Sequence, residues 1–249
     1  MSGTEQMALD EMLLEKSINQ SITSPSLRFY TWKGGPWLSI GHHQKKVPKE
    51  WIELSQKNKL QLVRRPTGGS AVLHSGGLTY SIIWPSPPRK KREAYLEASQ
   101  WLIKGFSDLG VSLHFGKSAQ VATTINCFSS STSADLIDEF GQKRVGSAQL
   151  WRQRYLLQHG EILLDPPRKL WMEVFESMPP EPAPVNFPRK GLEKALQQSI
   201  QKHWPKVKWK KEKLTKNDLS ELGLRAQKYL LRFDQSSLTI PPEIILSTT

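Results

Sequence analysis

The chain has 249 residues, 37% of them hydrophobic, which fits one large globular domain and excludes a short peptide or a long multidomain array. Its single cysteine excludes an internal disulfide framework and a cysteine-rich zinc site, so we expect a reducing, cytoplasmic environment. The net charge of +12 favours an acidic partner, and no apolar run approaches the length of a membrane-spanning helix.

The first third of the chain predicts two helices and two strands. Residues 5–19 place apolar side chains at helical spacing, with Thr4 as the cap. This acidic, amphipathic start differs from the basic and apolar pattern of a signal peptide. Residues 27–32 and 37–41 alternate like strands on either side of a Gly-Gly-Pro turn, and residues 47–58 predict a short helix that opens on a proline.

The segment RRPTGGSAVLHSGGLTYSIIWP, residues 64–85, carries the most unusual local chemistry. Gly68 and Gly69 allow backbone N–H groups to approach a ligand closely, which a β-carbon would block. Arg64 and Arg65 add positive charge beside this turn. Strands are predicted before and after the glycines, so the pattern indicates either a ligand-binding turn or a hairpin with a basic edge.

The remaining chain alternates predicted helices with further motifs. The run SSSTSAD, residues 129–135, is polar enough to predict a loop. A strand is predicted at residues 111–115. Helices are predicted at residues 95–109, 166–178, 187–203 and 214–231, the last one capped by Thr215.

Three motifs follow one another in the order found in a known group of enzymes. They are RRPTGG-x-AVLH with LTYS at residues 64–81, KRVGSAQ at residues 143–149 and QHGEI at residues 158–162. They resemble the RRxxGGGxVxH, KxxGSAQ and QHGxI motifs of the lipoate and biotin protein ligase superfamily. A Cys-Phe pair that begins sixteen residues before Lys143 resembles the cysteine-dependent octanoyltransferases of that superfamily. Ser75 stands where the family usually has an acidic residue.

The resemblance covers most of residues 5–232 and implies a fold as well as an activity. It implies an α/β (α+β) fold with a mixed β-sheet core surrounded by helices, in which the strands at 27–32 and 37–41 form the first hairpin. We expect a single catalytic domain over residues 1–235, followed by a C-terminal tail at 236–249 and no separate accessory domain.

The implied activity moves an octanoyl group from acyl carrier protein to a lysine of a lipoyl domain or of glycine-cleavage H protein, with no cofactor. A thiolate that first takes the acyl group as a thioester divides this transfer into two easier steps, and Cys127 is the only thiol. Lys143 can lower the pKa of that thiol and stabilise the oxyanion. The expected substrate-binding residues are Arg64, Arg65, Thr67, Gly68, Gly69, Ser70, Ala71, His74, Gly146, Ser147, Ala148, His159 and Gly160, with the two histidines as candidate proton carriers and no metal site.

Two alternatives remain. An ATP-dependent lipoate–protein ligase would use the glycine turn and Lys143 on an acyl-adenylate with Mg²⁺, and Cys127 would be idle. A non-catalytic protein could bind a carrier protein or a nucleic acid. Residues 186–232 hold 13 Lys and Arg against 4 Asp and Glu, but no nucleic-acid-binding motif accompanies them. We expect this basic segment to steer acidic carrier proteins, with a rate that falls as salt is added.

Overall fold

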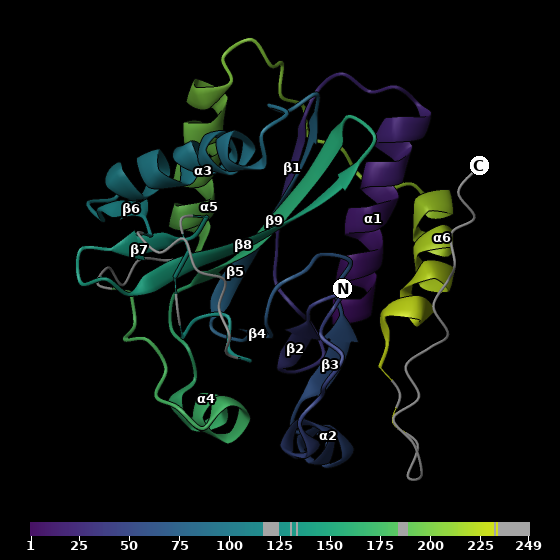
Figure 1. Cartoon of the computed structure of the whole chain (residues 1–249). Coiled ribbons are helices and arrows are strands. Elements are labelled where there is room, and N and C mark those ends of the chain that lie inside the picture. Colours follow the sequence, from purple (N-terminus) through teal and green to yellow (C-terminus); the bar gives the residue numbers. More distant parts are fainter. Residues whose placement is uncertain (117–124, 130, 133, 184–188, 232, 234–249) are drawn as a thin grey trace.

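The computed structural model describes residues 1–116, 125–129, 131–132, 134–183, 189–231 and 233 (Figure 1). The predicted tail at residues 236–249 lies outside them. The helices of the described chain are α1 (Gly3–Asn19), α2 (Lys49–Gln56), α3 (Lys91–Ser107), α4 (Arg168–Phe175), α5 (Arg189–His203), α6 (Lys216–Ala226) and the 3₁₀ helix η1 (Gln227–Tyr229). No helix within these residues has the length and apolar character needed to cross a bilayer.

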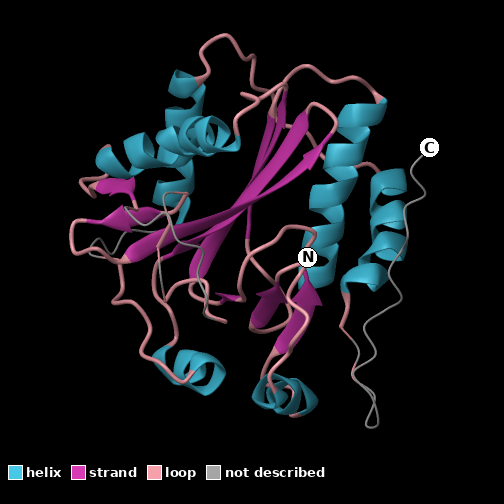
Figure 2. Ribbon diagram, viewed as in Figure 1, coloured by secondary structure: helices cyan, strands magenta, loops and turns pink. Residues whose placement is uncertain are grey.

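Two β-sheets form the centre of the molecule (Figure 2). The main sheet is antiparallel, with the strand order β1-β5-β9-β8-β7-β6. In the small sheet, β2 pairs in parallel with β3 and antiparallel with β4. The strands are β1 (Ser26–Tyr30), β2 (Trp37–Ile40), β3 (Gln61–Arg64), β4 (Val72–His74), β5 (Gly77–Pro85), β6 (Leu113–Phe115), β7 (Leu136–Asp138), β8 (Lys143–Arg152) and β9 (Tyr155–Leu163). The predicted α/β fold with helices around a β-sheet core is confirmed.

The predicted first hairpin is wrong, because β1 and β2 belong to different sheets. β1 pairs with β5, whereas β2 pairs with β3 and β4. Phe29 of β1 packs edge-on against Trp101 in the cluster beneath α3, while Leu38 and Ile40 of β2 are buried in a second cluster around Trp51. Since the two strands bury their apolar faces in separate cores, they cannot pair with each other.

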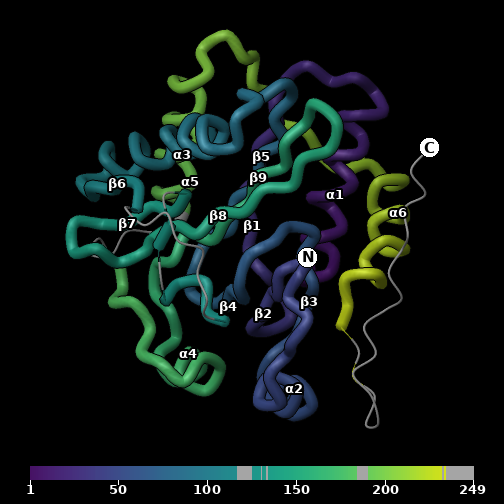
Figure 3. Tube along the Cα trace, viewed as in Figure 1, coloured from purple at the N-terminus to yellow at the C-terminus, as the bar shows by residue number. Residues whose placement is uncertain are grey.

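Helices cover both faces of the main sheet because side chains alternate along β5. Leu78, Tyr80 and Ile82 point into the cluster beneath α3 and α5, whereas Ile83 packs with Leu14 of α1 on the other face. Helix α6 lies beside α1, as Figure 3 shows. One face of the main sheet is therefore covered by α3 and α5. The other face is covered by α1, which also packs against the small sheet.

The helix ends follow local capping chemistry. The α1 cap is Ser2 rather than the predicted Thr4, because Ser2 and Glu5 form a reciprocal capping box. Thr215 caps α6 as predicted, with Asp218 completing its capping box. Each cap satisfies backbone N–H groups that the helix leaves unpaired and contributes about 1 kcal/mol.

Candidate active site

The glycine turn is held by a buried arginine, Arg65. The Arg65 guanidinium is 5% exposed and donates hydrogen bonds to the carbonyls of Ser39 (3.0 Å), Gly68 (2.6 Å) and Ser70 (2.8 Å). Burial lowers the pKa of Arg65 to about 10, which leaves it charged at neutral pH. Gly69 has a φ of +94°, a conformation that favours glycine. Arg65 therefore fixes the predicted cradle in one shape.

The neighbouring Arg64 faces away from this turn. Its Nη1 donates to the carbonyls of Gly41 (2.9 Å), His42 (3.2 Å) and Gln44 (2.9 Å), in the loop that follows β2. The same loop is tied to the glycine turn by a hydrogen bond from the His42 N–H to the Thr67 carbonyl (2.8 Å). Arg64 thus clamps a loop beside the cradle instead of lining the cavity.

Cys127 reaches the glycine turn through the backbone. The Ala71 N–H donates to the Ile125 carbonyl (2.9 Å), and the Cys127 N–H donates to the Ala71 carbonyl (3.0 Å). The next residue, Phe128, is buried against Trp171 of α4, with ring centroids 6.0 Å apart. This anchoring leaves the half-buried Cys127 thiol beside the predicted cradle.

Lys143 begins β8 and lies against Cys127. Its Nζ is 3.4 Å from the Cys127 Sγ and donates to the Cys127 carbonyl at 2.7 Å. A β-carbon at Gly146 would lie 3.0 Å from the Lys143 Cε and 3.5 Å from the Cys127 Sγ, so the glycine leaves room for the pair. The structure therefore brings together the two residues that the sequence predicts as catalytic.

A carboxylate that the sequence analysis missed faces the same lysine. The Asp135 Oδ2 lies 3.0 Å from the Lys143 Nζ, and both side chains are at most 5% exposed. Asp135 also accepts hydrogen bonds from the Thr132 N–H (2.7 Å) and hydroxyl (2.9 Å). The only local signal was its place at the end of the polar run at residues 129–135. The Asp135 carboxylate and the Cys127 thiol therefore contact the same lysine side chain.

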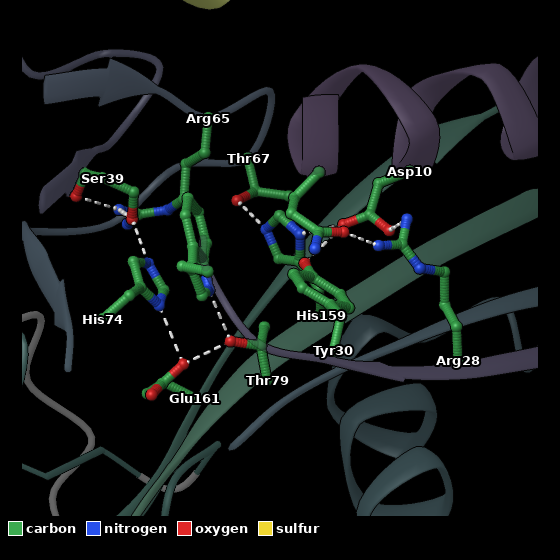
Figure 4. Close-up of polar contacts among 12 residues, drawn as sticks. Asp10, Arg28, Tyr30, Ser39, Arg65, Thr67, His74, Thr79, His159 and Glu161 are labelled. Atoms are coloured by element: carbon green, nitrogen blue, oxygen red, sulfur yellow. Dashed lines mark hydrogen bonds and ion pairs between the residues drawn. The ribbon is translucent and has the colours of Figure 1, made fainter. Parts of the chain in front are cut away.

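His159 is held at both ring nitrogens on the α1 face of β9 (Figure 4). Its Nδ1 is 2.9 Å from the Asp10 Oδ2, and its Nε2 is 2.7 Å from the Thr67 hydroxyl. The Asp10 carboxylate also accepts hydrogen bonds from Arg28 (3.0 Å) and from the Tyr30 hydroxyl (2.9 Å). Burial alone would raise the pKa of Asp10, but Arg28 and His159 bring it below its ordinary value.

His74 is held in a parallel way on the other side of the site. Its Nδ1 is 2.8 Å from the Glu161 Oε2, and its Nε2 is 2.8 Å from the Ser39 hydroxyl. Trp32 stacks on the imidazole at 3.8 Å between centroids. Burial lowers the pKa of His74 although Glu161 opposes this change, so the ring is neutral at pH 7. Each ring nitrogen of both histidines thus has a protein partner, and both side chains line the cavity.

These residues line a cavity whose empty space, including the part open to solvent, is about 430 Å³. The predicted residues that line it are Arg65, Gly68, Gly69, His74, Cys127, Gly146, Ser147, Ala148, His159 and Gly160. Arg64, Thr67, Ser70, Ala71 and Lys143 support it from outside. The lining residues that the sequence analysis missed are Met7, Tyr30, Trp32, Ser39, Val72, Thr79 and Glu161. Val72, Thr79 and Glu161 lie inside the quoted motifs but were not singled out, whereas Met7, Tyr30, Trp32 and Ser39 lie outside them.

Sequence comparison relates this chain to a known family and to named proteins. The family described as "Lipoyl protein ligase A/B catalytic domain" matches residues 2–211. The chain is 43% identical over 171 residues to octanoyltransferase LipM of Carboxydothermus hydrogenoformans, covering 66% of this chain and 61% of that protein. It is 36% identical over 208 residues to octanoyltransferase LipM of Geobacillus kaustophilus, covering 79% of this chain and 70% of that protein. The alignments thus span about three fifths of the length of the first relative.

Solved structures share the fold at low identity. A lipoate-protein ligase A bound with ATP superposes with a TM-score of 0.73 at 20% identity, covering 90% of both chains. A bipartite lipoate protein ligase of Thermoplasma acidophilum, studied with its E2 lipoyl domain, gives a TM-score of 0.67 at 18% identity, covering 90% of this chain and 88% of that one. At these identities, the likeness establishes the fold alone.

Proposed function

Because the chain belongs to the lipoyl protein ligase A/B catalytic-domain family, we propose that it is an octanoyltransferase acting in protein lipoylation. It takes an octanoyl group from acyl carrier protein, holds it on Cys127 as a thioester and passes it to a lysine of a lipoyl domain or of glycine-cleavage H protein. The observation that carries this proposal is the Cys127 Sγ, 3.4 Å from the buried Lys143 Nζ, at the wall of the cavity.

The cavity suits an apolar acyl chain although its walls contain many polar residues. The polar atoms of His74, His159 and Glu161 are turned toward protein partners such as Ser39 and Thr67. Polar groups that are already hydrogen-bonded do not need water, so an acyl chain can lie against their ring faces without leaving an unpaired donor or acceptor. Apolar contact comes from Met7, Val72 and Trp32.

In the first step, the Cys127 thiolate attacks the thioester carbonyl of the donor. A bond forms between Sγ and the carbonyl carbon, and the electron pair of the carbonyl moves to oxygen. The Lys143 ammonium faces this developing charge and stabilises it. Collapse of the intermediate breaks the bond to the carrier sulfur, which leaves as a thiol after taking a proton, and the octanoyl group remains on Cys127.

In the second step, the amine of the acceptor lysine attacks the Cys127 thioester. An amide forms, the Cys127 thiolate leaves, and the proton lost by the amine goes to solvent or to the thiolate. Asp135 holds the Lys143 side chain in an ion pair at 3.0 Å, so Lys143 acts as a fixed charge rather than as a base. The same ammonium therefore serves both tetrahedral intermediates.

Neither step uses ATP. The ligase alternative would instead activate free lipoate or octanoate as an adenylate and would leave Cys127 without a role. The two routes differ in which donor loads the protein and in whether Cys127 becomes acylated.

The test is the intact mass of the purified protein after mixing with octanoyl-loaded acyl carrier protein in the absence of ATP. We expect one octanoyl adduct on the wild type, none on Cys127→Ala, and onward transfer from the adduct to a lipoyl domain. Transfer that needs ATP and free acid, with no adduct on Cys127, would establish the ligase route and reject our proposal. The Cys127→Ala variant adds no polar group and keeps the cavity, so its loss reports the thiol alone.

A further inference from the structure

A cluster of exposed lysines lies in the loop between β2 and α2. We call residues 42–49 the lysine loop, after Lys45, Lys46 and Lys49, all three of which are exposed. In the described part of the chain none of the three lies within ion-pair distance of a carboxylate, whereas Lys57 and Lys59 just beyond are paired with Glu53 and Glu173. The lysine loop therefore carries uncompensated positive charge.

The lysine loop borders the mouth of the cavity. Arg64 holds its backbone through three carbonyls, as described above, and the His42 N–H binds the Thr67 carbonyl at 2.8 Å. A β-carbon at Gly68 would lie 4.0 Å from the His43 ring. Gly69, which lines the cavity, is exposed, so the turn that the lysine loop contacts lies where the cavity meets solvent. Lys45 and Lys46 directly follow Gln44, whose carbonyl Arg64 binds beside this turn.

The basic segment at residues 202–213 lies at the other end of the molecule (Figure 1). Its Trp204 packs against Trp84, with ring centroids 5.2 Å apart, at the far end of β5. Thr79, which lines the cavity, is five residues earlier on that strand, a separation of about 17 Å at roughly 3.4 Å per residue. Charges on exposed groups are largely screened beyond about 8 Å at physiological salt. This segment is therefore badly placed to act on a partner at the cavity mouth.

We propose that the lysine loop is the docking surface for the acyl carrier protein that donates the octanoyl group; this inference rests on the proposed function. The donor arm carries an anionic phosphodiester on an acidic protein, so a fixed cationic rim attracts it. The acceptor arm ends instead in a cationic lysine, which the same rim repels. Complementary charge at an entrance raises the rate of encounter and aligns the arm with the cavity.

The test compares two triple charge reversals that change the net charge equally. One variant carries Lys45→Glu, Lys46→Glu and Lys49→Glu. The control carries Lys206→Glu, Lys208→Glu and Lys211→Glu, three exposed lysines of the distal segment that have no ion-pair partner among the described residues. Acylation of Cys127 is measured by rapid quench with octanoyl-acyl carrier protein, and separately with octanoyl-pantetheine, a small donor without a phosphate.

With the carrier donor, we expect kcat/KM to fall by about 10- to 100-fold in the lysine-loop variant and less than about 3-fold in the control. With octanoyl-pantetheine, both variants should match the wild type, because no charged partner docks. Equal losses in the two variants, equal losses with the two donors, or an effect only on transfer to the lipoyl domain would each overturn the inference. A wild type that neither donor acylates would instead refute the proposed function.

Discussion

Replacing Asp135 by asparagine keeps the shape of the side chain but removes the carboxylate that faces the Lys143 ammonium. At their separation of 3.0 Å, an effective dielectric constant of about 20 gives a Coulomb attraction of about 5 kcal/mol. Loss of one partner of a buried ion pair costs about 3–5 kcal/mol of stability because the other charge is left uncompensated. In the Asp135→Asn variant, Lys143 therefore loses the buried partner that holds its side chain against the Cys127 sulfur.

The consequence for catalysis follows from that change. A Lys143 side chain that is no longer held in place donates a poorer hydrogen bond to the oxyanion, and removal of one such donor typically lowers the rate about 100- to 1000-fold. The acylation rate of Asp135→Asn should therefore fall by up to that factor. The assay is single-turnover acylation by octanoyl-pantetheine between pH 6 and pH 9, on protein shown to be folded by urea titration.

Asp138→Asn is the matched control. Asp138 forms a buried ion pair with Arg144 at 2.6 Å, three residues further along the same segment, but no contact between it and Cys127 or Lys143 is found among the described residues. Its loss should lower stability by a similar amount and change the acylation rate less than about 3-fold. An unaltered acylation rate in Asp135→Asn, or an equal loss in Asp138→Asn, would refute the role that we assign to Asp135.

Three further substitutions test residues outside the Cys127–Lys143 pair. Asp10→Asn should lower the free energy of unfolding by about 3–5 kcal/mol, since Arg28 loses its buried partner. Because the pKa of Asp10 is lowered in the folded state, its contribution is present above about pH 4 and is lost as the pH falls through the folded pKa; urea titrations from pH 7 to pH 3 should show a smaller acid dependence in the variant. Gly41→Ala should disturb the cradle and slow acylation, because its β-carbon would lie 1.9 Å from the Gly69 carbonyl oxygen, and a rate equal to that of the wild type would contradict this account. Gly223→Ala should instead raise stability by about 0.5–1 kcal/mol, as its β-carbon would meet nothing within 4 Å on an exposed helix face, and a lower melting temperature would argue against this placement of α6.

Local patterns in the sequence determined much of this molecule. Alternation and helix signals predicted the helices and the strands β1, β2, β5 and β6 within a few residues of where they lie, because both depend on neighbours along the chain. The strands β7, β8 and β9 were not predicted. The spacing between Cys127 and Lys143, together with the motifs around them, was enough to predict the pair that the structure brings to 3.4 Å. The family prediction is confirmed; the roles of the site residues remain predictions that the experiments above address.

Only the tertiary structure decided the rest. Asp10 and Asp135 carry no motif, and each became part of the site because packing brought a distant histidine or lysine against it. The strands at Ser26–Tyr30 and Trp37–Ile40 belong to two sheets because their apolar faces fill different cores. Alternation of apolar residues predicts a strand and its buried face, but it does not predict which strand it pairs with. The charge count likewise pointed to residues 186–232, yet the fold puts the lysine loop at the cavity. Periodicity specifies which face of an element is buried, and long-range packing specifies what it is buried against.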